Sequence, residues 1–118
     1  MMKNYKGSCH CSNVNFSFDS ETITQGARCN CSICQHKGAV MSVFTLPPEH
    51  IEIAAEKEAL GLYQFDTNVA KHYFCKNCGI YPFHQTMSKP GQYRINLGCL
   101  DDMDIEQLEI QLFDGKSI

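Results

Sequence analysis

Three cysteines lie within a six-residue stretch of the sequence, and their spacing suits metal binding: Cys29, Cys31 and Cys34. In an extended segment residues i and i+2 point to the same side, so Cys29 and Cys31 can bind one ion together, and a turn then brings Cys34 round. Zinc prefers four tetrahedral ligands, and three protein ligands with one open position are typical of a catalytic site. The triple therefore predicts a zinc ion with an open coordination position.

Two pairs of cysteines flank this triple in the sequence. Cys9 and Cys11 are separated by one residue, and Cys75 and Cys78 by two. Gly79 follows the second pair and tolerates the positive φ that a metal-binding turn of this kind often needs. A redox dithiol is the alternative for Cys75 and Cys78. The simplest division joins the two pairs in one closed four-cysteine zinc site, which would stabilise a small domain.

The fourth ligand of the triple remains open at this stage. Other divisions of the ligands would close the triple with Cys99, His36, His72 or His84. Cys99 stands alone, and a lone cysteine beside an apolar residue is more often a small buried hydrophobic group than a ligand. His10 lies between two better ligands, and in an extended segment its side chain points to the opposite face, so we expect it to be exposed.

Composition and charge limit the class of protein. The chain has 118 residues, of which 43% are hydrophobic, so we expect one domain over residues 1–118. A net charge of -3 with scattered Lys and Arg residues argues against nucleic-acid or anionic-membrane partners. The sequence has no apolar run long enough to span a bilayer, and its first residues lack a signal-peptide pattern. We therefore expect a soluble, cytoplasmic protein in which the cysteines bind metal instead of forming disulfides.

The pattern of apolar residues predicts a mainly β fold with at most short helices. Alternating apolar residues predict strands at 14–18, 50–54, 62–65, 70–74 and 93–97, and in the later part of 105–113. The apolar run 40–46 predicts a buried strand that Pro47 ends. Turns are expected at 19–21 and 66–68, and at most one helical turn fits near 56–60.

The order of these motifs resembles the glutathione-dependent formaldehyde-activating enzyme family, which includes centromere protein V. The matching segments are 7–11, 29–34 with Gly38 and Ala39, 72–84, 99–101 and 113–115. The resemblance covers nearly the whole chain and implies an Mss4-like (β-tent), zinc-stabilised antiparallel β-sheet fold. It also implies a carbon-sulfur lyase reaction, the reversible condensation of glutathione with formaldehyde to S-hydroxymethylglutathione.

Carried over to this sequence, the resemblance implies two zinc ions per chain. Cys9, Cys11, Cys75 and Cys78 would bind a structural zinc, and Cys29, Cys31 and Cys34 a catalytic one that is held more weakly. The expected partners are a small thiol such as glutathione and a small aldehyde, with no nucleic acid and no membrane. This ligand division agrees with the one that spacing alone favours.

Protons must move when a thiol adds to a carbonyl group. His84 and His72 are the catalytic candidates, with His36 behind them, because an unperturbed imidazole titrates near neutral pH. The simpler interpretation, that each is a packed side chain or one that supports a metal ligand, is favoured for all three. Lys37, Lys71 and Arg94 are the candidates for binding the negative charges of glutathione. The competing hypothesis is a non-catalytic, zinc-stabilised protein-binding module.

Overall fold

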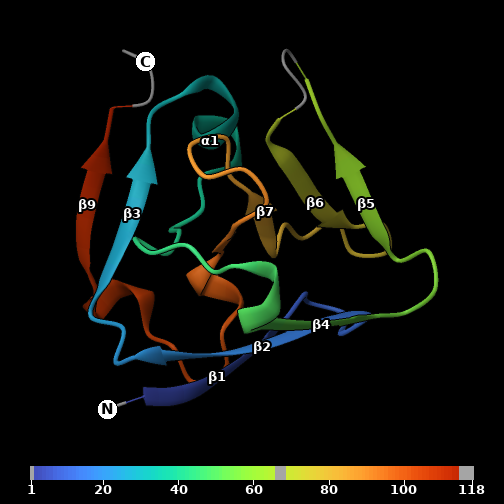
Figure 1. Ribbon diagram of the computed structural model, residues 1–118, viewed down its shortest axis with the longest axis horizontal. Coiled ribbons are helices and arrows are strands. Elements are labelled where there is room, and N and C mark those ends of the chain that lie inside the picture. Colours follow the sequence, from blue (N-terminus) through green and yellow to red (C-terminus); the bar gives the residue numbers. More distant parts are fainter. Residues whose placement is uncertain (1, 66–68, 115–118) are drawn as a thin grey trace.

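The computed structural model describes residues 2–65 and 69–114, in which short strands form three small β-sheets (Figure 1). The sheets have the strand orders β1-β2-β4, β3-β9 and β5-β6-β7-β8. The helical elements are short: α1 (Ser32–Lys37) and the 3-10 turns η1 (Pro48–His50), η2 (Leu97–Cys99) and η3 (Ile105–Gln107). Within these residues no helix is long and apolar enough to cross a membrane. The mainly β fold expected from the sequence is confirmed.

The first sheet is antiparallel and holds the first cysteine pair at one end. It consists of β1 (Met2–Ser8), β2 (Val14–Glu21) and β4 (Ile51–Ala55). Alternation along β2 turns Val14, Phe16 and Phe18 into the core, as the period of two requires. The hairpin connection between β1 and β2 carries Cys9 and Cys11, so the ladder of this sheet fixes their place.

The four-stranded sheet positions the second cysteine pair and two histidines. Its strands are β5 (Leu60–Tyr63), β6 (Lys71–Cys75), β7 (Phe83–Gln85) and β8 (Tyr93–Ile95), all antiparallel to their neighbours. The register sets His72 of β6 directly opposite His84 of β7. Directly opposed residues project to the same face of a sheet, so the two imidazoles are brought together. Cys75 ends β6.

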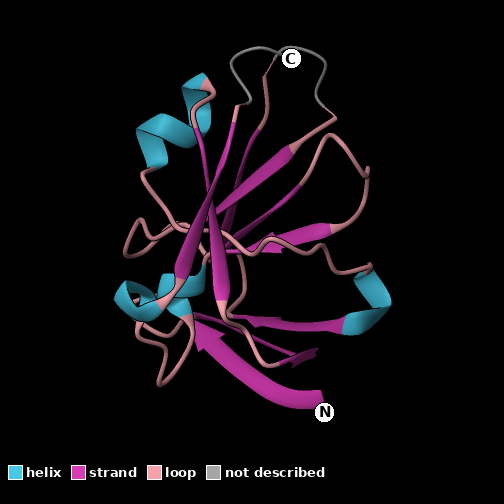
Figure 2. Cartoon of the chain, turned by 90° about the vertical axis from the view of Figure 1, so that its left-hand side faces the viewer, coloured by secondary structure: helices cyan, strands magenta, loops and turns pink. Residues whose placement is uncertain are grey.

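The remaining pair of strands leads into the cysteine triple. β3 (Gln25–Cys29) lies parallel to β9 (Glu109–Phe113), although we expected an antiparallel sheet throughout. Figure 1 shows the two strands side by side, with β3 leading towards α1, and Figure 2 shows the helices confined to the margins of the strands. A parallel pair needs a long connection, and here residues 30–108, which include α1 and strands β4 to β8, lie between the two strands in sequence.

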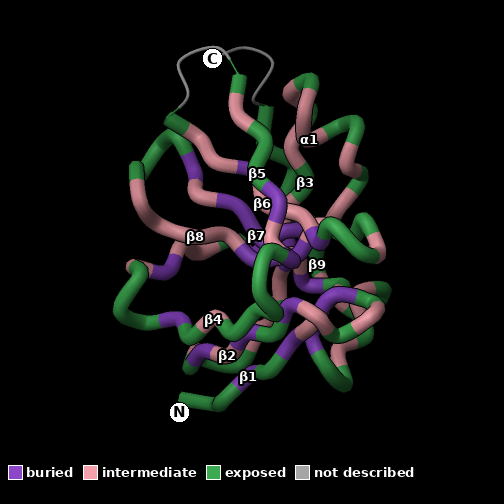
Figure 3. The backbone as a smooth tube through the Cα atoms, turned by 90° about the vertical axis from the view of Figure 1, so that its right-hand side faces the viewer, coloured by how far each residue is buried: buried purple, intermediate pink, exposed green. Residues whose placement is uncertain are grey.

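The core lies between the first sheet and the four-stranded sheet. Phe83 is fully buried, and its ring packs edge-on against Phe16 of β2 and Tyr93 of β8, with centroid distances of 5.6 and 5.5 Å. Edge-to-face pairs of this kind stabilise beyond the apolar area they bury. Figure 3 shows buried segments on both sheets facing this region. Apolar packing therefore joins the two sheets that carry the outer cysteine pairs.

Most predicted strands are confirmed, and two local predictions are wrong. Residues 40–46 form isolated bridges at Met41 and Leu46 instead of a strand. The buried hydroxyl of Ser42 donates to the carbonyl of Phe44 and accepts from the amide of Ile95, which bends the run away from a continuous ladder. The predicted turn at 19–21 is the end of β2, because pairing with β1 extends through this polar stretch. The predicted turn at 66–68 lies outside the described residues.

Gly7 of β1 lies where the hairpin meets the later part of the chain. A Cβ atom at this position would stand 2.5 Å from Cζ of Phe16 and 2.9 Å from the backbone carbonyl oxygen of Cys99. Because a backbone atom cannot move aside cheaply, we expect Gly7→Ala to lower the free energy of unfolding by about 1–3 kcal/mol. Denaturant titration measures this change.

Gly98→Ala is the matched control for this substitution. A Cβ there would meet only the side-chain oxygen of Asn96, at 3.3 Å, and a shift of a few tenths of an ångström relieves a contact of that length. We expect a smaller loss of stability than at Gly7. Equal losses in the two variants would contradict the close approach of β1 and η2.

Candidate metal centres

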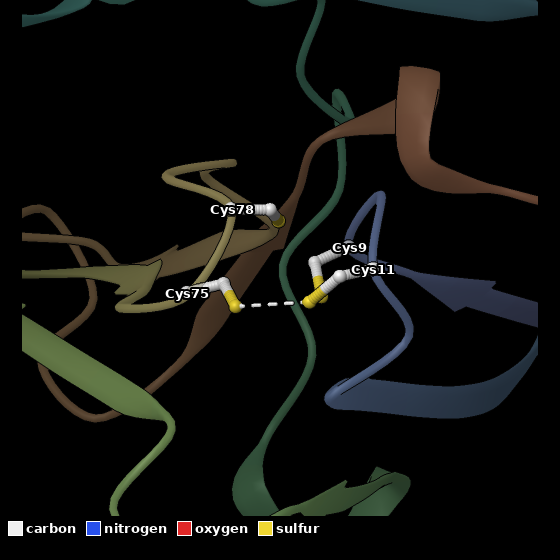
Figure 4. A group of neighbouring side chains, drawn as sticks. All are labelled: Cys9, Cys11, Cys75 and Cys78. Carbon is white, nitrogen blue, oxygen red and sulfur yellow. Dashed lines mark hydrogen bonds between the residues drawn. The ribbon is translucent and has the colours of Figure 1, made fainter.

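The outer cysteine pairs converge on one point between the two larger sheets. Figure 4 shows Cys9 and Cys11 on one side, Cys75 and Cys78 on the other, and the sulfurs of Cys11 and Cys75 facing each other. All four Sγ atoms lie within 4.8 Å of one another. The Sγ of Cys11 is 3.7 Å from that of Cys9 and 3.6 Å from that of Cys75.

These distances suit a tetrahedral metal ion. Four thiolates at about 2.3 Å from a central zinc would stand about 3.8 Å apart, close to the separations observed at Cys11. A disulfide would instead need sulfurs about 2 Å apart, and all eight cysteines are free thiols. The four-cysteine group could therefore hold a metal ion without rearranging its backbone.

Tight turns direct backbone amides towards these sulfurs. Gly79 adopts a φ of +80° and its amide donates to the carbonyl of Cys75 at 2.8 Å, closing the turn that carries Cys78. On the opposite side the amide of Val14 donates to the Sγ of Cys9 at 3.3 Å. The amide of Ile80 is the main reason that the pKa of Cys78 falls to about 6. A donated hydrogen bond favours the thiolate, which is the form that binds metal.

The cysteine triple forms a second group at the junction of β3 and α1. Cys29 ends β3, Cys31 is the extended residue before α1, and Cys34 lies within the helix. Their Sγ atoms also lie within 4.8 Å of one another, and all three side chains are half-buried. The amide of Cys31 donates to the Sγ of Cys29 at 3.4 Å. This group could hold a second metal ion through three thiolates.

The four candidates for a further ligand lie outside the triple. Among the residues that the structure describes, neither cysteine group includes His36, His72, His84 or Cys99. Cys99 is half-buried against the core, with its Sγ 3.8 Å from the carbonyl oxygen of Tyr81. The Nδ1 of the exposed His36 lies 2.7 Å from the carbonyl oxygen of Ser32. The geometry thus brings together the same sets of cysteines that the spacing predicts.

A cluster of polar side chains adjoins the triple and is called here the Lys37 cluster: Lys37, His72, Tyr81 and His84. Lys37 closes α1, and its Nζ lies 2.5 Å from Nδ1 of His72 and 3.7 Å from the centroid of the Tyr81 ring. The hydroxyl of Tyr81 forms a short hydrogen bond with Nδ1 of His84. The two imidazole rings have centroids 5.4 Å apart. The cluster joins α1 to the four-stranded sheet.

Burial makes the imidazoles of this cluster neutral. It lowers the pKa of His72 to about 4 and that of His84 to about 2, and the positive charge of Lys37 lowers both further. Burial also raises the pKa of Tyr81 well above its usual value. The Tyr81 hydroxyl therefore keeps its proton and donates a hydrogen bond to Nδ1 of His84. Nε2 of His72 is buried and has no hydrogen-bond partner within the described part of the chain.

Lys37 is the residue of this cluster with an unusual acidity near neutral pH. Burial lowers the pKa of its ammonium group to about 8, although the nearby Cys34 and Cys31 act in the opposite direction. The sequence indicated Lys37 only as an anion-binding candidate. Its contact with His72 joins residues 35 positions apart, so spacing in the sequence gave no signal for it.

The other two anion-binding candidates, Arg94 and Lys71, differ in how their side chains are placed. Nη1 of Arg94 donates to the carbonyl oxygens of Ser42 and Val43, at 2.9 and 3.2 Å. Arg94 is thus engaged with the backbone of the 40–46 segment. Lys71 is half-buried at the start of β6, one residue before His72.

Comparison with known proteins gave two findings. A sequence model of the family described as glutathione-dependent formaldehyde-activating enzyme matches residues 4–115. The crystal structure of a Rhodobacter sphaeroides protein is similar to this chain with a TM-score of 0.79 and 34% sequence identity. That similarity covers 90% of this chain and 99% of the other. The family match confirms the resemblance of the cysteine motifs.

The two cysteine groups should differ in affinity for metal, because one offers four thiolates and the other three. We expect a chelator to remove metal from the triple first. Cys78→Ser should lose both metal and folded structure, whereas Cys31→Ser should lose one metal and keep its fold. Elemental analysis with circular dichroism measures both properties. Equal unfolding of the two variants, or a metal-free protein under reducing conditions, would contradict this division.

His72 and His84 should remain neutral at about pH 5.5, because burial holds the pKa of each below that value. The unfolded chain binds protons at these rings below about pH 6.5, so the folded state loses stability as the pH falls from there towards the folded values. NMR of the imidazole rings measures their protonation directly. The urea-unfolded chain is the control. Protonation of either ring in the folded protein at about pH 5.5 would contradict the lowered pKa of that histidine.

Proposed function

The chain belongs to the glutathione-dependent formaldehyde-activating enzyme family, and from this we propose that it catalyses the reversible addition of a small thiol to a small carbonyl compound. Glutathione and formaldehyde are the substrates that the family implies. The observation that carries the proposal is the grouping of three half-buried thiols beside the Lys37 cluster, without a fourth cysteine or histidine among the described residues. Such a site leaves room for an external ligand.

We assign a different role to each cysteine group. The four-cysteine group, Cys9, Cys11, Cys75 and Cys78, would hold a structural zinc that ties the first sheet to β6. The triple, Cys29, Cys31 and Cys34, would hold the catalytic zinc. Soft thiolate donors at these separations suit zinc. When bound at three thiolates, zinc supplies a coordination position at which the pKa of an incoming thiol is lowered.

We propose that His72 and His84 act as neutral hydrogen-bonding groups. With pKa values of about 4 and about 2, they are poor proton donors near neutral pH. His72 instead positions the Nζ of Lys37, and His84 accepts from the hydroxyl of Tyr81. We propose that they serve the reaction by holding these two side chains against the triple. This replaces the general acid or base role considered from the sequence.

Positively charged side chains near the triple would favour the binding of an anionic thiol. Glutathione carries carboxylates, which Lys and Arg side chains can bind. Arg94 is already engaged with two backbone carbonyl groups, so Lys71 is the stronger candidate for an external carboxylate. Lys37 lies near the thiols, as its electrostatic interaction with Cys34 and Cys31 indicates.

The second candidate function is a non-catalytic, zinc-stabilised protein-binding module. The observation that favours it is the apolar surface of β9, where Leu112 is 85% exposed and Phe113 is 54% exposed. Exposed apolar side chains on a strand often mark a contact with another protein. In this function the bound metal would only stabilise the fold.

An assay of thiol addition separates the two candidates. We expect zinc-loaded protein to form S-hydroxymethylglutathione from glutathione and formaldehyde faster than the spontaneous reaction. Cys31→Ser should return the rate to the spontaneous value, because it removes a ligand from the triple. Cys99→Ala is the matched control, since Cys99 belongs to neither cysteine group, and it should retain the acceleration. Equal rates for wild type and Cys31→Ser, with glutathione and with other small thiols, would favour the binding module.

A further inference from the structure

Strand β9 forms a free edge of the fold that lacks the usual protection. Within residues 2–65 and 69–114 it pairs with β3 alone, and Figure 1 shows it at the margin of the molecule. Proteins commonly protect a free edge with lysine, proline, a bulge or a covering segment. Residues 109–113 contain no lysine, arginine, proline or glycine, and all five are exposed. An unprotected edge of this kind is a template for another strand.

Other edges of the sheets are covered or weakened. At the outer edge of β1 the amide of Asp101 donates to the carbonyl oxygen of Lys6 at 2.8 Å. At the outer edge of β8 the backbone groups of Tyr93 and Leu46 bond to each other in both directions, at 2.8 Å. β5 has only four residues and includes Gly61, which weakens the interior of a strand. These features direct attention to β9.

The ladder with β3 uses only alternate backbone groups of β9. The amide of Glu109 donates to the carbonyl oxygen of Thr24 at 3.1 Å, and the carbonyl oxygen of Phe113 accepts from the amide of Asn30 at 3.2 Å. Along a strand, residues whose backbone groups face one neighbour alternate with residues whose groups face the other side. The odd-numbered residues of β9 therefore bond to β3.

The backbone groups of Ile110 and Leu112 consequently face outwards, and their side chains form an apolar surface beside them. Two positions apart in a strand, these side chains project to the same face. Ile110 approaches the rest of the domain, since its Cδ1 lies 3.6 Å from the position of a Cβ atom at Gly26. Leu112 is 85% exposed. The apolar face of β9 thus continues beyond the part that the domain covers.

We propose that this edge is the contact with a second copy of the chain, in which two β9 strands pair antiparallel about a two-fold axis at Gln111. In this register Ile110 of each copy stands opposite Leu112 of the other. Residues whose backbone groups face outwards then meet, and each such pair can exchange both of its N–H···O bonds. Their side chains also meet, so that apolar groups lie opposite apolar groups. The strand is therefore complementary to itself in backbone and side chains.

The charges of β9 also fit a second copy. Glu109 would stand opposite Phe113 of the second copy, so the acidic residue of this strand does not face its own counterpart. Like charges directly opposite one another destabilise a strand pair, and the chain has a net charge of -3. A two-fold contact uses the same edge in both copies, so association stops at a dimer. The two-stranded sheets of the two copies would join into one of four strands, which is more stable than either alone.

Sedimentation equilibrium in reducing buffer, from micromolar to millimolar protein, tests the association. A single strand pair is a small interface, so we expect a reversible dimer whose fraction rises with concentration. Leu112→Lys places two cations in the apolar cluster and should raise the Kd of the dimer roughly tenfold or more. Leu62→Lys is the matched control, because Leu62 is an exposed apolar residue of another edge strand, β5, and it should dimerise like the wild type.

Metal content and circular dichroism verify that both variants are folded. Equal Kd values for the wild type and Leu112→Lys, or a loss of dimer in Leu62→Lys instead, would overturn the proposal. A wild-type protein that stays monomeric at every concentration would also overturn it, and would leave the β9 edge to a different protein. The inference concerns association alone and does not rest on the proposed thiol addition.

Amide hydrogen exchange followed by NMR tests the register of the strand pair. The amides of Gln111 and Phe113 face β3, so they should be protected in dilute and concentrated samples alike. The amides of Ile110 and Leu112 should exchange freely in the dilute protein and become protected as the dimer forms. A dimer in which these two amides remain unprotected would overturn the pairing of β9 with β9.

Discussion

The fold depends on the convergence of four thiols from two distant parts of the chain. Cys11 and Cys75 are 64 residues apart in sequence, yet their sulfurs lie 3.6 Å apart. They join the β1–β2 hairpin to the end of β6, where apolar contact between Phe16 and Phe83 also joins the two sheets. A domain of this size has a limited core, so a metal ion at the four thiols would contribute directly to folding. Thiolates left close together without a metal would instead repel one another.

The Lys37 cluster depends on the register of the four-stranded sheet. Pairing of β6 with β7 sets His72 opposite His84, and α1 places Lys37 against them. The result is a pair of buried, neutral imidazoles beside the half-buried side chain of Lys37. Burying such groups lowers stability, and natural proteins retain local conflicts of this kind mainly at functional sites. Nε2 of His72, which has no hydrogen-bond partner within residues 2–65 and 69–114, is a part of the same conflict.

Spacing in the sequence was enough to predict the two cysteine groups, because thiols a few residues apart can chelate with little help from the fold. Alternation likewise predicted β2, β4 and the β5–β6 hairpin. It did not predict β1, whose polar stretch is held by its ladder with β2, nor the parallel pairing of β3 with β9, which is set by long-range packing. The contacts of Lys37 and Tyr81 depend on the same tertiary arrangement, so the chemistry of that cluster was visible only in three dimensions.

Strand β6 carries residues of both the four-cysteine group and the Lys37 cluster. Cys75, at its end, belongs to the four-cysteine group, and His72, three residues earlier, holds the amine of Lys37. Because a paired strand behaves as a rigid element, a shift of Cys75 would carry His72 with it and alter the position of Nζ relative to the triple. The position of the four-cysteine group therefore also bears on the position of the half-buried Lys37, which interacts electrostatically with Cys34 and Cys31 of the triple.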